Sequence, residues 1–240
     1  MKSIDAYDLK GRVAKYDKEM DIMHPNRPKM VNIGLEFLPF NQDQQIKVLD
    51  LGVGTGFFTQ KLLQKFTNAQ VVALDGAQLM IDLAKARLED FEKSIKYVVG
   101  DFRDIDNTFD NKKEIFDVVI SSFAFHHLSF EEKKQTFKKV HDLLKNGGWM
   151  INADCIVDKN PLIEQRFQEK RVEGIVVRAK GQRPFDSSDS TRKYLDRREA
   201  EEKDNPLTIE QELQAFEFGG FKNISILWKE YREAVCCGQK

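Results

Sequence analysis

Residues 46–66 constrain the fold of this chain most, because a strand pattern, a glycine turn and a helix pattern follow one another directly. An apolar strand pattern at residues 46–51 leads into Gly52, Gly54 and Gly56, which occupy every second position. Glycine readily adopts positive φ, and such a turn brings backbone N–H groups to a ligand at a helix N-terminus. These residues therefore predict a ligand-binding loop between a strand and a helix.

A second apolar strand, residues 71–74, ends at Asp75. An acidic residue at this strand tip, about 20 residues after the glycine turn, is where such folds hold the diol of a ribose. The glycine spacing distinguishes two kinds of nucleoside site. Dinucleotide binders favour G-x-G-x-x-G, whereas this chain has G-x-G-x-G and places Phe57 where the next glycine or alanine would stand.

Preceded by Leu-Asp-Leu, this tighter spacing resembles motif I of the class I S-adenosylmethionine-dependent methyltransferases, in their free-standing, small-molecule branch. The resemblance implies S-adenosylmethionine as the cofactor and S-adenosylhomocysteine as its product. It places the backbone of Gly52, Gly54 and Gly56 against the amino-acid end of the cofactor. It also implies that Asp50 helps to hold the amino group and that Asp75 binds the ribose.

The same resemblance implies further cofactor contacts. At the end of the third strand, Asp101 would bond the adenine amino group and Phe102 would cover a ring face, which suits the N–H donors and the π surface of adenine. Met80 would pack on adenine from the first turn of the next helix, and Tyr16 would close over the donor. Asp101 also suits a simpler role, as the cap of the following turn.

The fourth strand, residues 116–122, is followed closely by two adjacent histidines, His126 and His127. Ligands of open parallel sheets bind at the carboxyl ends of the strands, so Ser121 and the residues after it are expected to face the cofactor and its methyl group. The pattern resembles motif IV of the small-molecule branch. Both histidines are candidate bases, because an ordinary histidine titrates near pH 6.5. We favour His127; alternatively, a histidine here only bonds the backbone near the next helix.

Strands and helices alternate through the core. Strand patterns lie at 46–52, 70–75, 95–100, 116–122 and 148–156, and helix patterns at 56–66, 77–91 and 130–145. This alternation indicates an α/β fold with a parallel sheet and helices on both faces. The family resemblance specifies a Rossmann-like seven-stranded sheet in the order 3-2-1-4-5-7-6, with strand 7 antiparallel. The glycines of 146–148 are expected to stop the helix before them.

The length of 240 residues suits a single domain. We divide it into a helical cap (1–40), a cofactor-binding core (41–157), a helical lid insert (158–206), and a last helix with a closing hairpin (207–240). The insert is rich in charged residues. This composition suits either a pair of solvated helices or a lid that directs one basic group at an acidic substrate.

Composition argues against several kinds of partner. The net charge of −1 provides no global basic field for nucleic acid. No apolar run reaches a length of about 18 residues, which a bilayer-spanning helix requires. The N-terminus lacks the apolar part of a secretory signal. Three cysteines make a poor disulfide framework, and no metal-ligand spacing is present. We therefore expect a cytoplasmic monomer or homodimer without a metal. Of Cys236 and Cys237, one side chain is expected to point inward.

The expected reaction is methyl transfer to an O, N, S or C nucleophile of a small molecule. Three alternatives remain open. The first is a relative that processes a modified donor, such as carboxy-S-adenosylmethionine synthase of tRNA wobble-uridine modification; it needs a basic residue near the sulfonium, for which Arg171, Arg178 and Arg192 are equal candidates. The second is methylation of tRNA or protein. The third is a non-catalytic interaction protein that keeps the fold.

Overall fold

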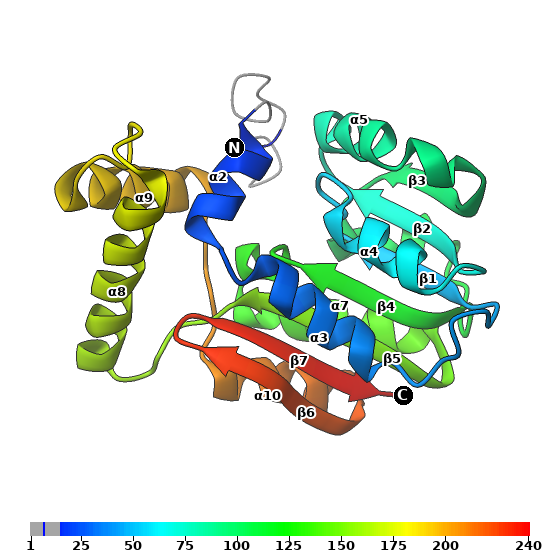
Figure 1. The fold of residues 1–240 in the computed structure, drawn as a ribbon. Helices are drawn as coiled ribbons and strands as arrows, with labels where there is room; N and C mark the ends of the chain where they lie inside the picture. The colour runs from blue at the N-terminus through cyan, green and yellow to red at the C-terminus, as the bar shows by residue number, and fades with distance from the viewer. Residues whose placement is uncertain (1–6, 8–14) are drawn as a thin grey trace.

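The computed structural model describes Tyr7 and residues 15–240, and these residues contain one seven-stranded sheet (Figure 1). Its strands are β1 (Lys47–Leu51), β2 (Gln70–Asp75), β3 (Ile95–Val99), β4 (Phe116–Ser122), β5 (Leu144–Cys155), β6 (Lys222–Glu230) and β7 (Glu233–Gln239). Their order is β3-β2-β1-β4-β5-β7-β6, and β7 is antiparallel to both of its neighbours. The predicted strand order and the antiparallel seventh strand are confirmed.

Helices cover both faces of this sheet. They are α2 (Tyr16–Met23), α3 (Arg27–Phe37), α4 (Phe57–Lys65), α5 (Gln78–Arg87), α6 (Ile105–Thr108), α7 (Phe130–Leu143), α8 (Pro161–Ala179), α9 (Ser188–Glu202) and α10 (Ile209–Gly219). Side chains alternate along β1, so Val48 packs in the cluster under α3, α4 and α5, while Leu49 packs in the cluster under α7 and α10. On β7 the same alternation buries Cys237 on the first face and Cys236 on the second. The prediction that only one of these cysteines points inward was wrong, because helices cover both faces.

One helix end also differs from the prediction. The capping box at Ser129 that begins α7 is present, but α7 ends at Leu143, before the glycines of 146–148. Leu144 adopts an extended backbone and pairs with Phe116 of β4. Strand β5 therefore begins four residues earlier than the predicted 148–156, and Gly147, with φ of +78°, lies inside it.

The predicted cap divides into two helices with different surroundings; residues 1–6 and 8–14 of it lie outside the described residues. Helix α3 packs on the sheet against β5, β6 and β7. Gly34 allows this approach, because a β-carbon there would lie 2.7 Å from Cγ2 of Ile151. Helix α2 instead stands beside the carboxyl ends of the parallel strands, together with α8 and α9 (Figure 1).

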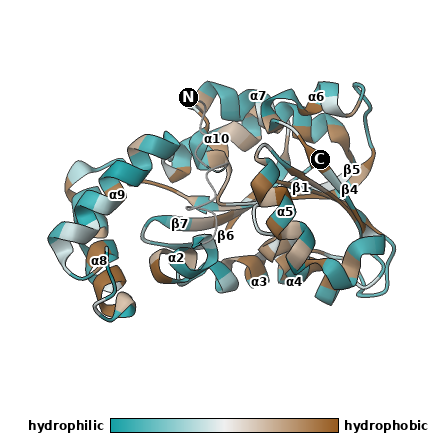
Figure 2. Cartoon of the chain, turned by 90° about the horizontal axis from the view of Figure 1, so that it is seen from above, coloured by the Kyte–Doolittle hydropathy of each residue, from teal (hydrophilic) through white to brown (hydrophobic). Residues whose placement is uncertain are grey.

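The insert consists of two helices, α8 and α9, as the charge pattern predicts. Seen from above, they project from the side of the sheet, and α9 is largely hydrophilic (Figure 2). Arg198 of α9 is ion-paired with Glu19 of α2 at 2.6 Å, and the hydroxyl of Tyr194 donates to the same carboxylate. These contacts join the insert to α2. Among the described helices, none combines the length and hydropathy that a bilayer crossing requires.

A buried ion pair joins α7 to α10 and yields a stability prediction. Lys133 and Glu212 have side chains 0% and 2% exposed, with Nζ and Oε2 2.7 Å apart. Glu212→Leu would leave the lysine charge buried without its partner, so we expect it to lower the free energy of unfolding by about 3–5 kcal/mol. Denaturant titration measures this loss. The exposed pair of Lys159 and Glu210 is the control, because Glu210→Leu should change stability little; equal losses in both variants would contradict the prediction.

Candidate active site

The glycine turn between β1 and α4 has the backbone that its spacing predicts. Gly52, Gly54 and Gly56 all have positive φ, between +52° and +82°. A β-carbon on Gly52 would lie 2.5 Å from the β-carbon of Ala124, and one on Gly56 would lie 2.8 Å from Cδ1 of Leu88. Neither position has room for a side chain, so both the backbone conformation and the packing require glycine here.

Two carboxylates support this turn. Asp75, at the end of β2, accepts hydrogen bonds from the backbone N–H of Gly54 at 2.8 Å and of Ala77 at 2.9 Å. It therefore ties the turn to the start of α5. Asp50 is buried and accepts a hydrogen bond of 2.6 Å from the hydroxyl of Thr59. Burial raises the pKa of Asp50 to about 7, against the opposing effect of this bond.

A cavity, which we call the loop cavity, opens above the turn at the tips of β1, β2 and β4. Most of the predicted cofactor residues line it: Tyr16, Asp50, Gly52, Gly54, Asp75, Met80 and Phe102. The candidate base His127 lies on the same wall. Three predicted residues, Gly56, Asp101 and Ser121, do not line it. The structure thus brings together residues from five separate segments of the chain.

The residues outside the wall have other contacts. Asp101 forms an ion pair of 2.6 Å with Arg103 and accepts from the Arg103 backbone N–H at 3.0 Å, which is the capping role considered above. Its role toward adenine stays a prediction. The Ser121 hydroxyl donates to the carbonyl of Leu51 at 2.7 Å and so joins β4 to β1. The hydroxyl at the loop cavity belongs to Ser122, whose buried Oγ has no hydrogen-bond partner among the described residues.

The two adjacent histidines have opposite electrostatic surroundings. His126 Nδ1 lies 2.6 Å from Oδ1 of Asp154, and its Nε2 lies 3.7 Å from Oδ1 of Asp204. Burial alone would lower the pKa of His126, but these two carboxylates outweigh it and raise the pKa to about 9. His126 is therefore protonated at neutral pH and unsuited to accept a proton.

His127 has the properties that a base requires. Burial and the positive charge of His126 lower its pKa below the ordinary value, against the pull of Asp204. Its Nε2 lies 3.1 Å from the hydroxyl of Tyr7. Its Nδ1 lies 3.0 Å from Oδ1 of Asp204, although without the alignment of a hydrogen bond. The neutral ring is thus held between a phenol and a carboxylate, which favours His127 over His126 as the sequence analysis does.

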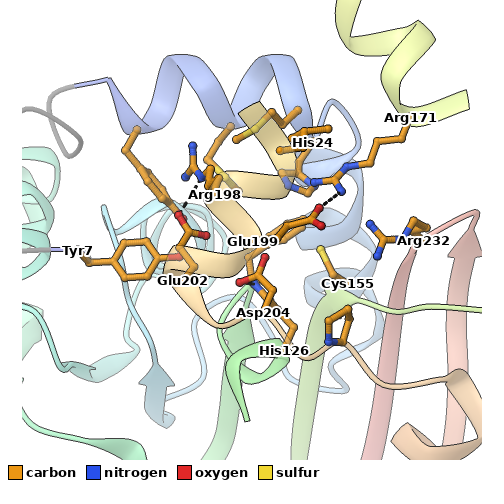
Figure 3. A pocket seen from close by; sticks show the side chains of 16 residues that line it. Tyr7, His24, His126, Cys155, Arg171, Arg198, Glu199, Glu202, Asp204 and Arg232 are labelled. Carbon is orange, nitrogen blue, oxygen red and sulfur yellow. Dashed lines mark hydrogen bonds and ion pairs between the residues drawn. The ribbon is translucent and has the colours of Figure 1, made fainter. Parts of the chain in front are cut away.

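A second cavity, the inner cavity, adjoins the loop cavity and is drawn in Figure 3. Both cavities are lined by Tyr7, Tyr16 and Phe123. Charged groups from α9 and the segment after it, including Arg198 and Asp204, line the inner cavity. A ligand in the loop cavity and a second ligand in the inner cavity would therefore meet beside Tyr7, at the wall that holds His127.

Sequence reasoning missed several residues of this site. Asp154 is the second-last residue of β5, and its position at a strand tip is a usable signal. Tyr7, Arg198 and Asp204 come from the cap and the insert, where no motif marks them. Asp204 reaches the histidines because α9 ends at Glu202, the next residue, Lys203, is in the left-handed region, and the Asn205 N–H donates to the His126 carbonyl at 2.7 Å.

The grouping of His126, His127 and Asp204 also bears on the expectation of no metal site. Ligand atoms of these three residues lie within 4.8 Å of one another, although the residues come from two segments without metal-ligand spacing. The expectation of no metal therefore stays a prediction.

The chain is similar in sequence and in fold to known methyltransferases. Residues 48–148 match a family described as a methyltransferase domain. An uncharacterized methyltransferase from Anoxybacillus flavithermus is 33% identical over 129 residues, which are 54% of this chain and 56% of that protein. The chain thus spans little more than half of that relative. A carboxy-S-adenosyl-L-methionine synthase from Nautilia profundicola is 21% identical over 214 residues, 89% of this chain and 86% of that protein.

A solved structure of similar fold is a phosphoethanolamine N-methyltransferase 2 from Haemonchus contortus in complex with S-adenosyl-L-methionine. Its TM-score is 0.66 at 18% identity, and the match covers 94% of this chain and 46% of that chain. At this identity the likeness is one of fold.

Proposed function

We propose that this chain, a class I S-adenosylmethionine-dependent methyltransferase by its family match, moves a methyl group from S-adenosylmethionine to an O, N, S or C nucleophile of a small molecule. The observation that carries this proposal is the pair of adjoining cavities that share Tyr7, Tyr16 and Phe123. The glycine turn borders the first cavity, and the polar groups of the insert border the second. Such a pair can hold donor and acceptor side by side, which supplies a large part of the rate enhancement.

The residues of the loop cavity fit the proposed donor. The backbone at Gly52 and Gly54 is open to a ligand, and Asp50 and Asp75 provide carboxylates for an ammonium group and a ribose diol. Met80 and Phe102 provide apolar surface for an adenine ring. When bound, S-adenosylmethionine supplies a methyl carbon already activated by its sulfonium. The chain then has to position the acceptor, exclude water and remove a proton where one must leave.

We assign proton removal to Tyr7, His127 and Asp204 acting together. In this assignment the ring proton of His127 is on Nδ1, which faces Asp204. Nε2 is then free to accept the proton of the Tyr7 hydroxyl, which lies 3.1 Å away. The Tyr7 oxygen can then take a proton from the acceptor. Burial raises the pKa of Tyr7 well above its usual value, so Tyr7 passes a proton on and does not itself ionise.

Calorimetry tests the donor assignment. We expect S-adenosylmethionine and S-adenosylhomocysteine to bind with one-to-one stoichiometry and NADH to give no heat. The opposite pattern, NADH binding without either sulfur nucleoside, would refute the proposal. Mass spectrometry of a co-purifying nucleoside, followed by a metabolite screen for turnover of the donor, would then identify the acceptor.

The raised pKa of Asp50 predicts that donor binding releases a proton near pH 7. Folding holds this carboxyl near half protonation at that pH, and a bound cationic amino group would favour the charged form. Donor affinity should therefore rise as the pH increases through about 7 and weaken below it. Calorimetry in two buffers with different heats of ionisation measures the released proton. Asp50→Asn should abolish the difference between buffers, and an unchanged difference would exclude Asp50 as its source.

A second candidate function is the synthesis of a carboxylated donor. The relative from Nautilia profundicola is named for this activity, and its match covers 89% of this chain, which favours the candidate. Of the three arginines considered for this role, Arg171 lines the inner cavity, whereas Arg178 and Arg192 do not. Arg198, which the sequence analysis did not single out, lines it as well. Incubation with prephenate and mass spectrometry of the nucleoside separates the candidates, since only a carboxylated product supports the second.

A further inference from the structure

The acceptor path extends beyond the inner cavity, and the inference drawn from it depends on the proposed function. A third cavity, the outer cavity, lies between α8, the turn from α2 to α3 and the turn from β6 to β7. Its wall and that of the inner cavity share five residues: Met23, His24, Cys155, Arg171 and Arg232. The inner cavity therefore adjoins the loop cavity on one side and the outer cavity on the other. Two guanidinium groups lie where the inner cavity meets the outer cavity.

Arg171 and Arg232 come from different elements, α8 and the β6–β7 turn, yet both enter the same space (Figure 3). Their side chains are only 16% and 12% exposed. Burial lowers the pKa of Arg232, and the positive charge of Arg171 lowers it further. Two like charges held together away from solvent cost free energy; Glu199 and Glu164 offset part of this cost, and an anion between the arginines would offset more.

The described residues leave much of this hydrogen-bonding capacity unused. Arg171 donates from Nη1 to Glu199 at 2.6 Å. Nε of Arg232 lies 2.8 Å from Glu164 but without hydrogen-bond alignment, and it has no hydrogen-bond partner among the described residues. Each guanidinium carries five N–H donors in a planar fork that matches carboxylate and phosphate oxygens. Donors therefore remain for an anionic ligand.

The opposite end of the inner cavity is unsuited to an anion. Tyr7 and Glu202 lie at that end in Figure 3, across the cavity from Arg171 and Arg232. Arg198 at that end is ion-paired with two carboxylates, Glu19 at 2.6 Å and Glu202 at 2.8 Å. An acceptor with one anionic end would thus be oriented, with that end at the arginine pair and its other end toward Tyr7.

We propose that the methyl acceptor carries an anionic oxyacid group, a carboxylate or a phosphate monoester, that binds across Arg171 and Arg232 while the reacting atom lies beside Tyr7 and His127. The arginines bind and orient this group and take no part in the chemistry. This assigns a binding site at the junction of the inner and outer cavities and narrows the acceptor to small anionic metabolites.

Titration of the complex with S-adenosylhomocysteine by inorganic phosphate, at constant ionic strength, tests the arginine pair without an acceptor. We expect Arg171→Gln and Arg232→Gln each to weaken phosphate binding at least tenfold. Arg166→Gln, an exposed position on the same helix, should leave it unchanged. Glu199→Gln removes the competing carboxylate and should strengthen binding, a gain that misfolding cannot mimic. Phosphate affinity that is absent in the wild type, or equal in all four variants, would overturn the proposal.

A second experiment identifies the charge of the natural acceptor. Methyl-labelled donor is incubated with the protein and a metabolite extract, and the labelled product is passed over a strong anion exchanger at neutral pH. Retention of the product supports the proposal, and a labelled product that is not anionic overturns it. If no labelled product forms from any extract, the proposed methyl transfer fails, while the phosphate titration still decides whether the arginine pair binds anions.

Discussion

Replacing His127 with asparagine is expected to lower methyl transfer about 100- to 10,000-fold, the range that a positioned base contributes. The asparagine side chain keeps a polar group in the wall but cannot accept a proton at neutral pH. Donor affinity should stay within about twofold of the wild type, because the contacts of the glycine turn and Asp75 do not include His127. Turnover with the labelled donor and calorimetry with the unlabelled donor measure the two quantities separately.

The pH dependence distinguishes this role from a structural one. Burial and the charge of His126 lower the pKa of His127, and the relay works only with the neutral ring. At saturating donor, the wild-type rate should therefore be constant near neutrality and fall as the pH drops through a value below the ordinary histidine pKa of about 6.5. This acid limb should disappear in His127→Asn. Tyr7→Phe removes the hydroxyl that contacts Nε2 and should lower the rate by a similar factor. A fully active His127→Asn variant would exclude His127 as the base.

The fold was predictable because its signals are local. The inner parallel strands β1, β2 and β4 are largely apolar and buried on both faces, as at Val71 and Val119, and each ends where a turn or a polar residue follows in the sequence. The glycine turn and Asp75 lie at such strand tips, so the same pattern that predicts the sheet also predicts the donor side of the site. The choice between Ser121 and Ser122 was missed because successive strand residues face opposite sides, and the sequence does not mark which side is open.

The acceptor side was not predictable for a different reason. Tyr7, Asp204 and Arg232 come from segments far apart in the sequence, and their meeting depends on how α8, α9 and the β6–β7 turn pack around the strand tips. Asp204 is positioned by a left-handed residue and one backbone hydrogen bond, neither of which has a sequence pattern of its own. Charged residues of the insert look alike in sequence, but few of those on α8 and α9 line the inner cavity: Arg171, Arg198, Glu199 and Glu202.

Gly52→Ala should weaken donor binding at least 100-fold, the largest effect on binding that we expect. The added methyl group would lie 2.5 Å from the β-carbon of Ala124, in a residue with φ of +76°. The left-handed conformation costs about 1–2 kcal/mol for alanine, and the clash forces the turn or the tip of β4 to move. Because Asp50 and Asp75 are placed by this turn, the displacement would disturb the donor contacts together. Calorimetry with S-adenosylhomocysteine measures the loss.

Two further variants separate the clash from the backbone strain. Gly181 has nearly the same φ, +77°, with no atom within 4 Å of an added β-carbon. Gly181→Ala therefore carries the strain alone and should leave donor affinity unchanged. Ala124→Gly removes the opposing β-carbon, so the double variant Gly52→Ala, Ala124→Gly should regain at least tenfold of the lost affinity, about 1.4 kcal/mol. If the single variant binds the donor normally, the backbone at Gly52 does not contact it. If the double variant recovers nothing, strain in the turn and not its approach to Ala124 controls donor binding.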